Sequence, residues 1–321
     1  MIKVSNLTKD YGPRRAIFDL SFSVEKGEIV GFLGPNGAGK TTAMRILSGY
    51  MPPTSGKVEI GGYDIFEDSL KARQIIGYLP ETVPLYNDMT VFDYIKFMAQ
   101  LRKVKHVDDR VDEVLELVHL DDRSDSLVSR LSKGMKQRVG IAQALVHKPE
   151  VLILDEPTVG LDPTQIIDVR NLIKEVGKEH TVLLSTHILS EAQHVCDRVL
   201  IINKGQIVAE DTTERLQSRL AGSQRVSVTV RGEIEAVLPL IAHTAGVISV
   251  QKKSDQSAEF ETSQNEDARS KVAKNIINAG HDLLELHTAS MSLEEIFLQL
   301  IQDDSSQNGQ ENASIKSSPE R

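Results

Sequence analysis

Short apolar runs alternate with longer helical patterns over the first two thirds of the chain. The clearest apolar runs are Ile29–Leu33, Ile75–Leu79, Val151–Leu154 and Val182–Ser185. Turn-forming or polar residues follow each run at once, as expected for buried strands. Strands that alternate with helices favour a mostly parallel sheet covered by helices. The pattern therefore predicts an α/β fold over residues 1–221.

The alternation is interrupted between residues 82 and 130, where apolar positions recur with the period of a helix. One predicted face carries Val91, Tyr94, Ile95 and Met98, and a second carries Val111, Val114, Leu115 and Val118. Apolar residues three and four positions apart lie on one side of a helix. We predict that residues 82–130 form a helical subdomain inserted into the α/β fold.

A different pattern follows residue 221. Strand-like alternation at residues 226–230 leads into a helical stretch at 237–241, two short strands, a helix ending near Ala279 and a strand at 283–286. This order predicts a small α+β domain of the βαββαβ type in residues 222–302. Ser292 and Glu295 form a capping box before a final predicted helix. Residues 303–321 are mostly polar, and we predict that they are disordered.

Charge and composition exclude several classes of protein. The 321 residues have a formal net charge of −9, which argues against nonspecific binding to nucleic acid or anionic lipid. The local basic cluster of Arg102, Lys103 and Lys105 is interpreted as a solvated face. No apolar run reaches the roughly 18–20 residues of a membrane span. The first residues lack the charged and apolar segments of a signal peptide, so we expect none. Cys196 is the single cysteine, so no internal disulfide forms; we expect a buried thiol and a cytoplasmic protein.

A glycine-rich segment follows the strand Ile29–Leu33 and begins a helix. It consists of Gly34, Pro35, Asn36, Gly37, Ala38, Gly39, Lys40, Thr41 and Thr42. Glycines let backbone N–H groups curl around phosphate oxygens, and the helix N-terminus adds partial positive charge. Lys40 is expected to reach the β- and γ-phosphates of ATP, and Thr41 to bind Mg²⁺. This context makes an ordinary glycine-rich turn a remote alternative.

Polar residues follow three further predicted strands, where ligands of open α/β sheets bind. Asp155 and Glu156 end the strand that begins at Val151, and we expect Asp155 to bind Mg²⁺ and Glu156 to polarise water. His187 follows a second strand and is placed to contact the γ-phosphate. Glu81 follows a third and adds a carboxylate near the metal. Solvated acids and a structural histidine are the alternatives.

Ser132 and Gly134 precede a long predicted helix. Ser132 is a good helix N-cap, and capping alone would explain it. Together with Gly134 it is also suited to present a hydroxyl group, N–H groups and a helix dipole to an anion.

In this order the segments resemble the ATP-binding cassette of ABC transporters over residues 1–221. The resemblance implies Walker A at 34–42, Walker B at 151–156 with a catalytic Glu156, the signature motif at 131–137, a D-loop ending at Asp162, and a switch histidine at His187. It also implies that Tyr11 stacks on adenine, although packing of Tyr11 on an early strand is the alternative. The chain departs from the family pattern at Lys133 and Met135 of the signature, and at Glu81, where the family usually has glutamine.

The family resemblance implies a Mg-ATP-dependent ATPase that works as a dimer. Each ATP would lie between Walker A of one subunit and Ser132 and Gly134 of the other, in a homodimer or with a related ATPase subunit. The resemblance further implies integral membrane permease subunits as partners, docked near Glu81 and the helical subdomain. The expected location is the inner face of the cell membrane, with no span of its own and no nucleic acid partner.

Residues after 221 are similar to the extensions of exporter ATPases of gliding-motility, multidrug and polysaccharide systems. The segment Ser292-Leu-Glu-Glu-Ile-Phe-Leu is the basis of that similarity, and it favours export. An ABC importer ATPase is the nearest alternative. A soluble ABC ATPase and a nucleotide-binding regulator without turnover are less favoured, because the chain has one phosphate loop and retains Glu156 and His187.

Overall fold

The computed structural model describes residues 1–212, 223–263 and 268–289. The chain divides into two compact units, Met1–Thr212 and Thr213–Arg321, and each is described by itself. The expected boundary at residue 221, the predicted helix that begins after Ser292 and the predicted disordered tail at 303–321 lie outside the described residues.

A six-stranded sheet forms the centre of the first unit. Its order is β10 (Gln206–Asp211), β9 (Arg198–Asn203), β3 (Ile29–Leu33), β8 (Thr181–Thr186), β7 (Val151–Asp155) and β6 (Ile76–Leu79). Strand β10 is antiparallel to β9, and the other neighbours pair in parallel. The four predicted strands are confirmed, each within one residue at either end. Their carboxyl ends share one edge, as parallel strands require.

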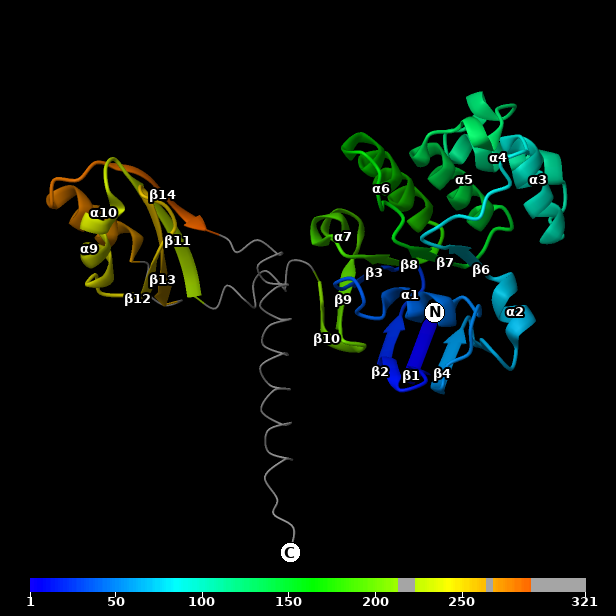
Figure 1. Cartoon of the computed structure of the whole chain (residues 1–321), viewed down its shortest axis with the longest axis horizontal. Coiled ribbons are helices and arrows are strands. Elements are labelled where there is room, and N and C mark those ends of the chain that lie inside the picture. The colour runs from blue at the N-terminus through cyan, green and yellow to red at the C-terminus, as the bar shows by residue number, and fades with distance from the viewer. Residues whose placement is uncertain (213–222, 264–267, 290–321) are drawn as a thin grey trace, which may run out of the picture. The chain divides into compact units, whose positions relative to one another are not determined.

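Helices cover both faces of this sheet, which confirms the predicted α/β class. Helices α6 (Pro163–Gly177) and α7 (Leu189–Val195) lie on one face, and α1 (Lys40–Leu47) lies on the other (Figure 1). Pro163 begins α6, where its missing N–H costs nothing, and Asp162 caps the same helix.

A second, antiparallel sheet packs over α1 and was not predicted. Its order is β2 (Arg14–Val24), β1 (Ile2–Tyr11), β4 (Ser55–Ile60) and β5 (Tyr63–Asp64). The pairing of β1 with β2 shifts register between Val4 and Leu7 and twice more before Asp10. Such bulges interrupt the two-residue alternation that identifies a half-buried strand in sequence.

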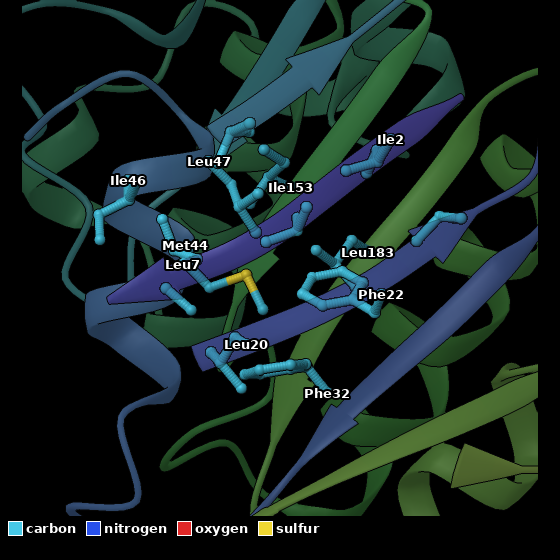
Figure 2. Packing of buried hydrophobic residues seen from close by; sticks show 14 of the residues in the cluster. Ile2, Leu7, Leu20, Phe22, Phe32, Met44, Ile46, Leu47, Ile153 and Leu183 are labelled. Atoms are coloured by element: carbon cyan, nitrogen blue, oxygen red, sulfur yellow. The ribbon is translucent and has the colours of Figure 1, made fainter. Parts of the chain in front are cut away.

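The main core fills the space between the two sheets and α1. Figure 2 shows Leu20, Phe22, Phe32 and Met44 packed together from β2, β3 and α1. The rings of Phe22 and Phe32 lie 5.7 Å apart, within the range of favourable aromatic pairs. Because Met44 of α1 packs in this core, the core holds α1 in place against the two sheets.

The predicted helical subdomain is confirmed. Helices α3 (Val91–Leu101) and α4 (Val107–Leu117) and the short turns η1 (Asp121–Arg123) and η2 (Val128–Arg130) lie in it, before α5 (Lys133–Leu145). Helix α2 (Ser69–Gln74) precedes β6. The second predicted face is buried throughout, whereas on the first Met98 is partly exposed and Ala99 is buried instead.

The second unit has the predicted βαββαβ order. Its elements are β11 (Ser223–Val230), η3 (Ile234–Ala236), α9 (Leu238–Ala242), β12 (Val247–Lys252), β13 (Ser257–Ser263), α10 (Arg269–Asn278) and β14 (Leu283–Ala289). The sheet is antiparallel in the order β12-β13-β11-β14. Val226, Val228 and Val230 point into its core with Phe260. Across the described parts of both units, every helix is too short or too polar to cross a membrane.

Candidate active site

The glycine-rich loop connects β3 to α1 in a conformation that needs glycine. Gly37 and Gly39 have φ angles of 83° and 110°, which side chains rarely allow. A Cβ on Gly34 would lie 2.4 Å from the carbonyl oxygen of Ile202, and one on Gly39 would lie 2.7 Å from that of Ala16. The loop therefore packs against β9 and β2, and its shape depends on glycine at these positions.

Lys40 is the first residue of α1, and its side chain turns back into the loop. It is 6% exposed, and its Nζ donates to the carbonyl oxygen of Gly34 at 2.7 Å. The same Nζ lies 3.2 Å from Glu156 Oε1. A buried cation at a helix N-terminus forms a strong site for phosphate.

Asp155 ends β7 beneath the loop and is fully buried. Ser185 is its register neighbour on β8 and donates to Asp155 Oδ1 at 2.6 Å, while Thr41 Oγ1 lies 3.4 Å from that oxygen. Burial raises the pKa of Asp155, and hydrogen bonds from Ser185 and Thr41 oppose the increase. Among the described residues, Oδ2 has no hydrogen-bond partner.

These groups fit a magnesium ion. Mg²⁺ is usually held by one or two carboxylates together with the phosphates of the substrate. The free Oδ2 of Asp155 and the hydroxyl of Thr41 are oxygen ligands of that kind, at the loop expected to hold phosphate. Groups of three or more acids, histidines or cysteines suited to a metal are absent from the described residues, as expected for such a site.

Glu156 and His187 come from adjacent strand ends and contact each other. Glu156 has a φ of 50° and is 6% exposed, and its N–H donates to Ser185 Oγ at 3.0 Å. His187 Nδ1 lies 2.9 Å from Glu156 Oε2. A left-handed backbone at a non-glycine residue is strained and is often found at functional sites. The two carboxylate oxygens thus face Lys40 on one side and His187 on the other.

A buried hydrogen-bonded cluster holds the segments that follow Glu156 and precede His187. Glu191 of α7 accepts from Thr158 Oγ1 at 2.5 Å and from Thr186 Oγ1 at 3.3 Å. Sequence reasoning missed Glu191, Thr158 and Ser185. The position of Ser185 and Thr186 at a strand end was the only signal in the sequence, and it did not indicate their partners.

A cavity of about 870 Å³ opens above these groups. Of the predicted residues, it is lined by Tyr11, Asn36, Gly37, Gly39, Lys40, Thr41, Thr42, Glu81, Glu156 and His187. Arg14, Arg15 and Lys204 also line it and were not predicted. Tyr11 is 45% exposed and ends β1. The volume suits a nucleotide-sized ligand with its phosphates at α1.

Seven predicted residues are not part of the lining of this cavity. Gly34, Pro35 and Ala38 belong to the glycine-rich loop and Asp155 to the end of β7, whereas Ser132, Gly134 and Asp162 lie at the starts of α5 and α6. Ser132 caps α5 by accepting from Met135 N at 3.3 Å, and Asp162 caps α6 by accepting from Gln165 N at 3.0 Å. Gly134 is buried, and a Cβ there would lie 2.7 Å from the Gln165 side chain. Within one chain these last three residues have structural roles.

Two of the three departures from the family pattern, Glu81 and Lys133, lie close together. Glu81 and Lys133 line a second cavity of about 440 Å³, together with Lys136. Glu81 also lines the larger cavity, and its charge helps to raise the pKa of Asp155. The extra carboxylate is therefore accompanied by cations from the start of α5.

A family model described as ABC transporter matches residues 17–159. The linearmycin resistance ATP-binding protein LnrL of Bacillus subtilis is 37% identical, covering 94% of this chain and 98% of that protein. This chain belongs to the ABC transporter ATP-binding proteins. The bacitracin transport ATP-binding protein BcrA of Bacillus licheniformis is 36% identical, covering 94% and 97% of the two chains. The daunorubicin resistance ATP-binding protein DrrA3 of Streptomyces coeruleorubidus is 32% identical, covering 94% and 96%.

Solved structures agree with this assignment. A structure of an ATP-binding subunit of an ABC transporter is 32% identical, with a TM-score of 0.62, covering 69% of this chain and 93% of the other. A dimeric post-hydrolysis state of the cassette MJ0796 bound to ADP and Pi is 26% identical, with a TM-score of 0.61, covering 66% and 98%. This ABC protein is thus an ATP-binding subunit that hydrolyses ATP to power transport.

Proposed function

We propose that this ABC subunit hydrolyses Mg-ATP in the cavity above α1 and thereby powers export through a separate membrane permease. One observation supports the catalytic assignment most directly. Lys40 at the start of α1 and His187 after β8 both contact the carboxylate of Glu156 after β7. The distances are 3.2 Å from Lys40 Nζ to Oε1 and 2.9 Å from His187 Nδ1 to Oε2. A phosphate held by Lys40 lies within reach of a general base at Glu156, and His187 orients that carboxylate.

Backbone N–H groups of the glycine-rich loop and of the start of α1 cradle the phosphates, and Lys40 neutralises their charge. Thr41 and Asp155 hold Mg²⁺, with Glu81 as a further carboxylate at that end of the cavity. When bound, the ion supplies charge neutralisation at the β- and γ-phosphates. Tyr11 stacks on the adenine ring; its half-exposed ring at the cavity edge supports this role.

Two copies complete each ATP site in this proposal. Ser132, Gly134 and Asp162 lie outside the cavity of their own chain, so a second subunit has to present them. The start of α5 has an exposed Ser132, and a helix N-terminus favours an anion. The dimeric structure of the related MJ0796 cassette supports this arrangement. ATP closes the dimer because its γ-phosphate contacts both subunits.

The permease helix docks in a shallow groove between α3 and the sheet, placing this subunit at the inner face of the membrane. Tyr50 and Leu101 are 74% and 62% exposed, and each lines one of two small cavities in this groove. The two cavities have volumes of about 160 Å³ each, and Tyr78 and Arg102 line both of them. Tyr78 lies on β6, which leads directly to Glu81, so the groove is connected to the ATP cavity.

Export is proposed because of the relatives. Proteins named for linearmycin resistance, bacitracin transport and daunorubicin resistance match this chain over more than nine tenths of its length. An ATP-driven transport system that confers resistance to a compound is expected to act by removing it from the cell. We therefore expect an antibiotic as cargo, chosen by the permease.

The Glu156→Gln variant tests the catalytic assignment. It keeps the shape of the side chain and removes the base, so turnover falls by at least about 100-fold while ATP binding persists. Size-exclusion chromatography with ATP should then show a trapped dimer. The matched control is Glu150→Gln, an exposed carboxylate outside the cavity. Unchanged turnover in Glu156→Gln would contradict the assignment.

Co-purification from native membranes tests the transport assignment separately. A multi-span permease alone fits export, whereas a permease with a substrate-binding protein would indicate import. Recovery with neither would contradict transport while leaving the ATPase intact.

A further inference from the structure

A further cavity, separate from the ATP cavity and from the one lined by Glu81 and Lys133, lies between α2, the α3–α4 loop and the end of α5. Its volume is about 660 Å³. It is lined by residues 102–106, among them Lys103 and Lys105, and by Gln74, Asp109, Arg110, Glu113 and residues 146–148. None of these residues lines the ATP cavity. The basic cluster interpreted from sequence as a solvated face therefore borders a cavity.

Positive charge dominates this cavity, although the whole chain has a net charge of −9. Five cationic side chains line it, and two acidic ones. Glu113 is already paired with Arg110 at 2.8 Å and with Lys148 at 3.3 Å. Within the described part of the chain, Lys103 and Lys105 have no carboxylate within ion-pair distance. The excess charge at the rim is thus not neutralised by the protein.

Arg110 organises the floor of the cavity. It is 8% exposed and donates to the carbonyl oxygens of Val146 at 3.0 Å and Leu145 at 2.7 Å. These bonds tie the end of α5 to α4. Lys103 and Lys148 have left-handed backbones, with φ angles of 56° and 51°, where α3 and α5 end. The loops that bear the cations are therefore held by defined helix ends.

Two polar groups next to the rim have lowered pKa values, mainly because of burial and in smaller part because of neighbouring cations. Arg102 donates to the carbonyl oxygen of Arg73 at 2.7 Å, and partial burial and the charge of Arg73 lower its pKa. His147 donates from Nε2 to the Ile76 carbonyl oxygen at 2.9 Å. Its buried Nδ1 has no partner among the described residues. Burial and Arg102 lower the pKa of His147 to about 4, so the ring stays neutral at pH 7.

We propose that this cavity binds an anion bearing phosphate groups. A phosphate group offers several acceptor oxygens to N–H donors at once, and it carries one charge as a diester and nearly two as a monoester. Lys103 and Lys105 supply mobile ammonium groups at the rim, and Arg102 supplies a planar guanidinium group. The source is either a soluble phosphate compound or the headgroup of an anionic lipid.

Methyl NMR of the full chain tests the site directly. The methyl groups of Val104 and Val146 line the cavity and distinguish binding here from binding at the glycine-rich loop. Titration with inorganic pyrophosphate should shift both signals to saturation. Lys103→Ala/Lys105→Ala should weaken binding by about tenfold or more, because two charge-assisted contacts are lost. Both lysines are exposed, so the variant should fold.

The matched control is Lys174→Ala/Lys178→Ala, which removes two exposed lysines at α6 and should leave the affinity unchanged. Flotation with phosphatidylglycerol vesicles, compared with phosphatidylcholine vesicles, distinguishes the sources. Binding of pyrophosphate alone indicates a soluble ligand; selective binding to phosphatidylglycerol that is lost in the Lys103/Lys105 variant indicates a lipid headgroup. The proposal is overturned if neither probe binds, or if the two double variants bind equally well.

Discussion

The buried carboxylate of Glu191 offers a sharp test of how the catalytic segments are held. Glu191 is 6% exposed, and within the described residues no cation pairs with it. Two threonine hydroxyl groups, from Thr158 and Thr186, donate to one of its oxygens at 2.5 and 3.3 Å. Thr158→Val removes the shorter bond and keeps the volume of the side chain. No cavity forms, so the change in stability reports the lost hydrogen bond together with the cost of leaving the carboxylate less well satisfied.

Hydrogen bonds to charged groups contribute about 1.5–3 kcal/mol, and an unsatisfied buried charge costs at least as much. We therefore expect Thr158→Val to lower the free energy of unfolding by about 2 kcal/mol. Because Thr158 lies two residues after Glu156, turnover should fall more than ATP affinity. The control is Thr164→Val on the exposed side of α6, which should change stability by less than about 0.5 kcal/mol.

Urea unfolding followed by near-ultraviolet circular dichroism measures this difference. All six tyrosines lie at or before Tyr94, and the chain has no tryptophan. The tyrosine signal therefore reports the first unit and avoids mixing two unfolding transitions. In a Glu191→Gln background, Thr158→Val should cost at least about 1 kcal/mol less, because the charge is gone. If Thr158→Val and Thr164→Val have equal effects, the reasoning is wrong.

Three further predictions concern other parts of the first unit. Gly77→Ala should lower the free energy of unfolding of the first unit by about 1–3 kcal/mol in the same assay, because the added Cβ would lie 2.2 Å from the carbonyl oxygen of Ala144. An unchanged urea midpoint would contradict this packing. His147 has a folded pKa of about 4, below its ordinary 6.5. The unfolded chain therefore binds a proton at His147 as the pH falls below 6.5, whereas the folded chain does not. Between pH 7.5 and 5 the free energy of unfolding of the wild type should fall by about 2 kcal/mol more than that of His147→Gln. Parallel curves of unfolding free energy against pH for the two proteins would refute this. Leu101→Glu should reduce permease recovery in co-purification without changing basal ATPase activity, because it places a charge in the proposed docking groove; full recovery would exclude that groove.

The sequence by itself determined the features that depend on local pattern. Ile29–Leu33 is a continuous apolar run followed by glycines, and both the strand and the loop conformation follow from residue types close together in the chain. The same holds for the face of α4 that begins with Val111. The order of strands and helices in the second unit was also readable, because residues 226–230 keep their alternation and pair with β13 without a register shift.

Only the tertiary structure decided which of these segments meet. Ser185 bonds Asp155 across 30 residues of sequence, and Thr41 approaches it across 114, because β8 lies between β3 and β7 in the sheet. The bulged strand β1 and the basic cavity around Lys103 are likewise products of packing between distant segments. Periodicity records how a residue faces its own helix or strand, whereas neighbours across the fold are selected by burial and register summed over the whole core.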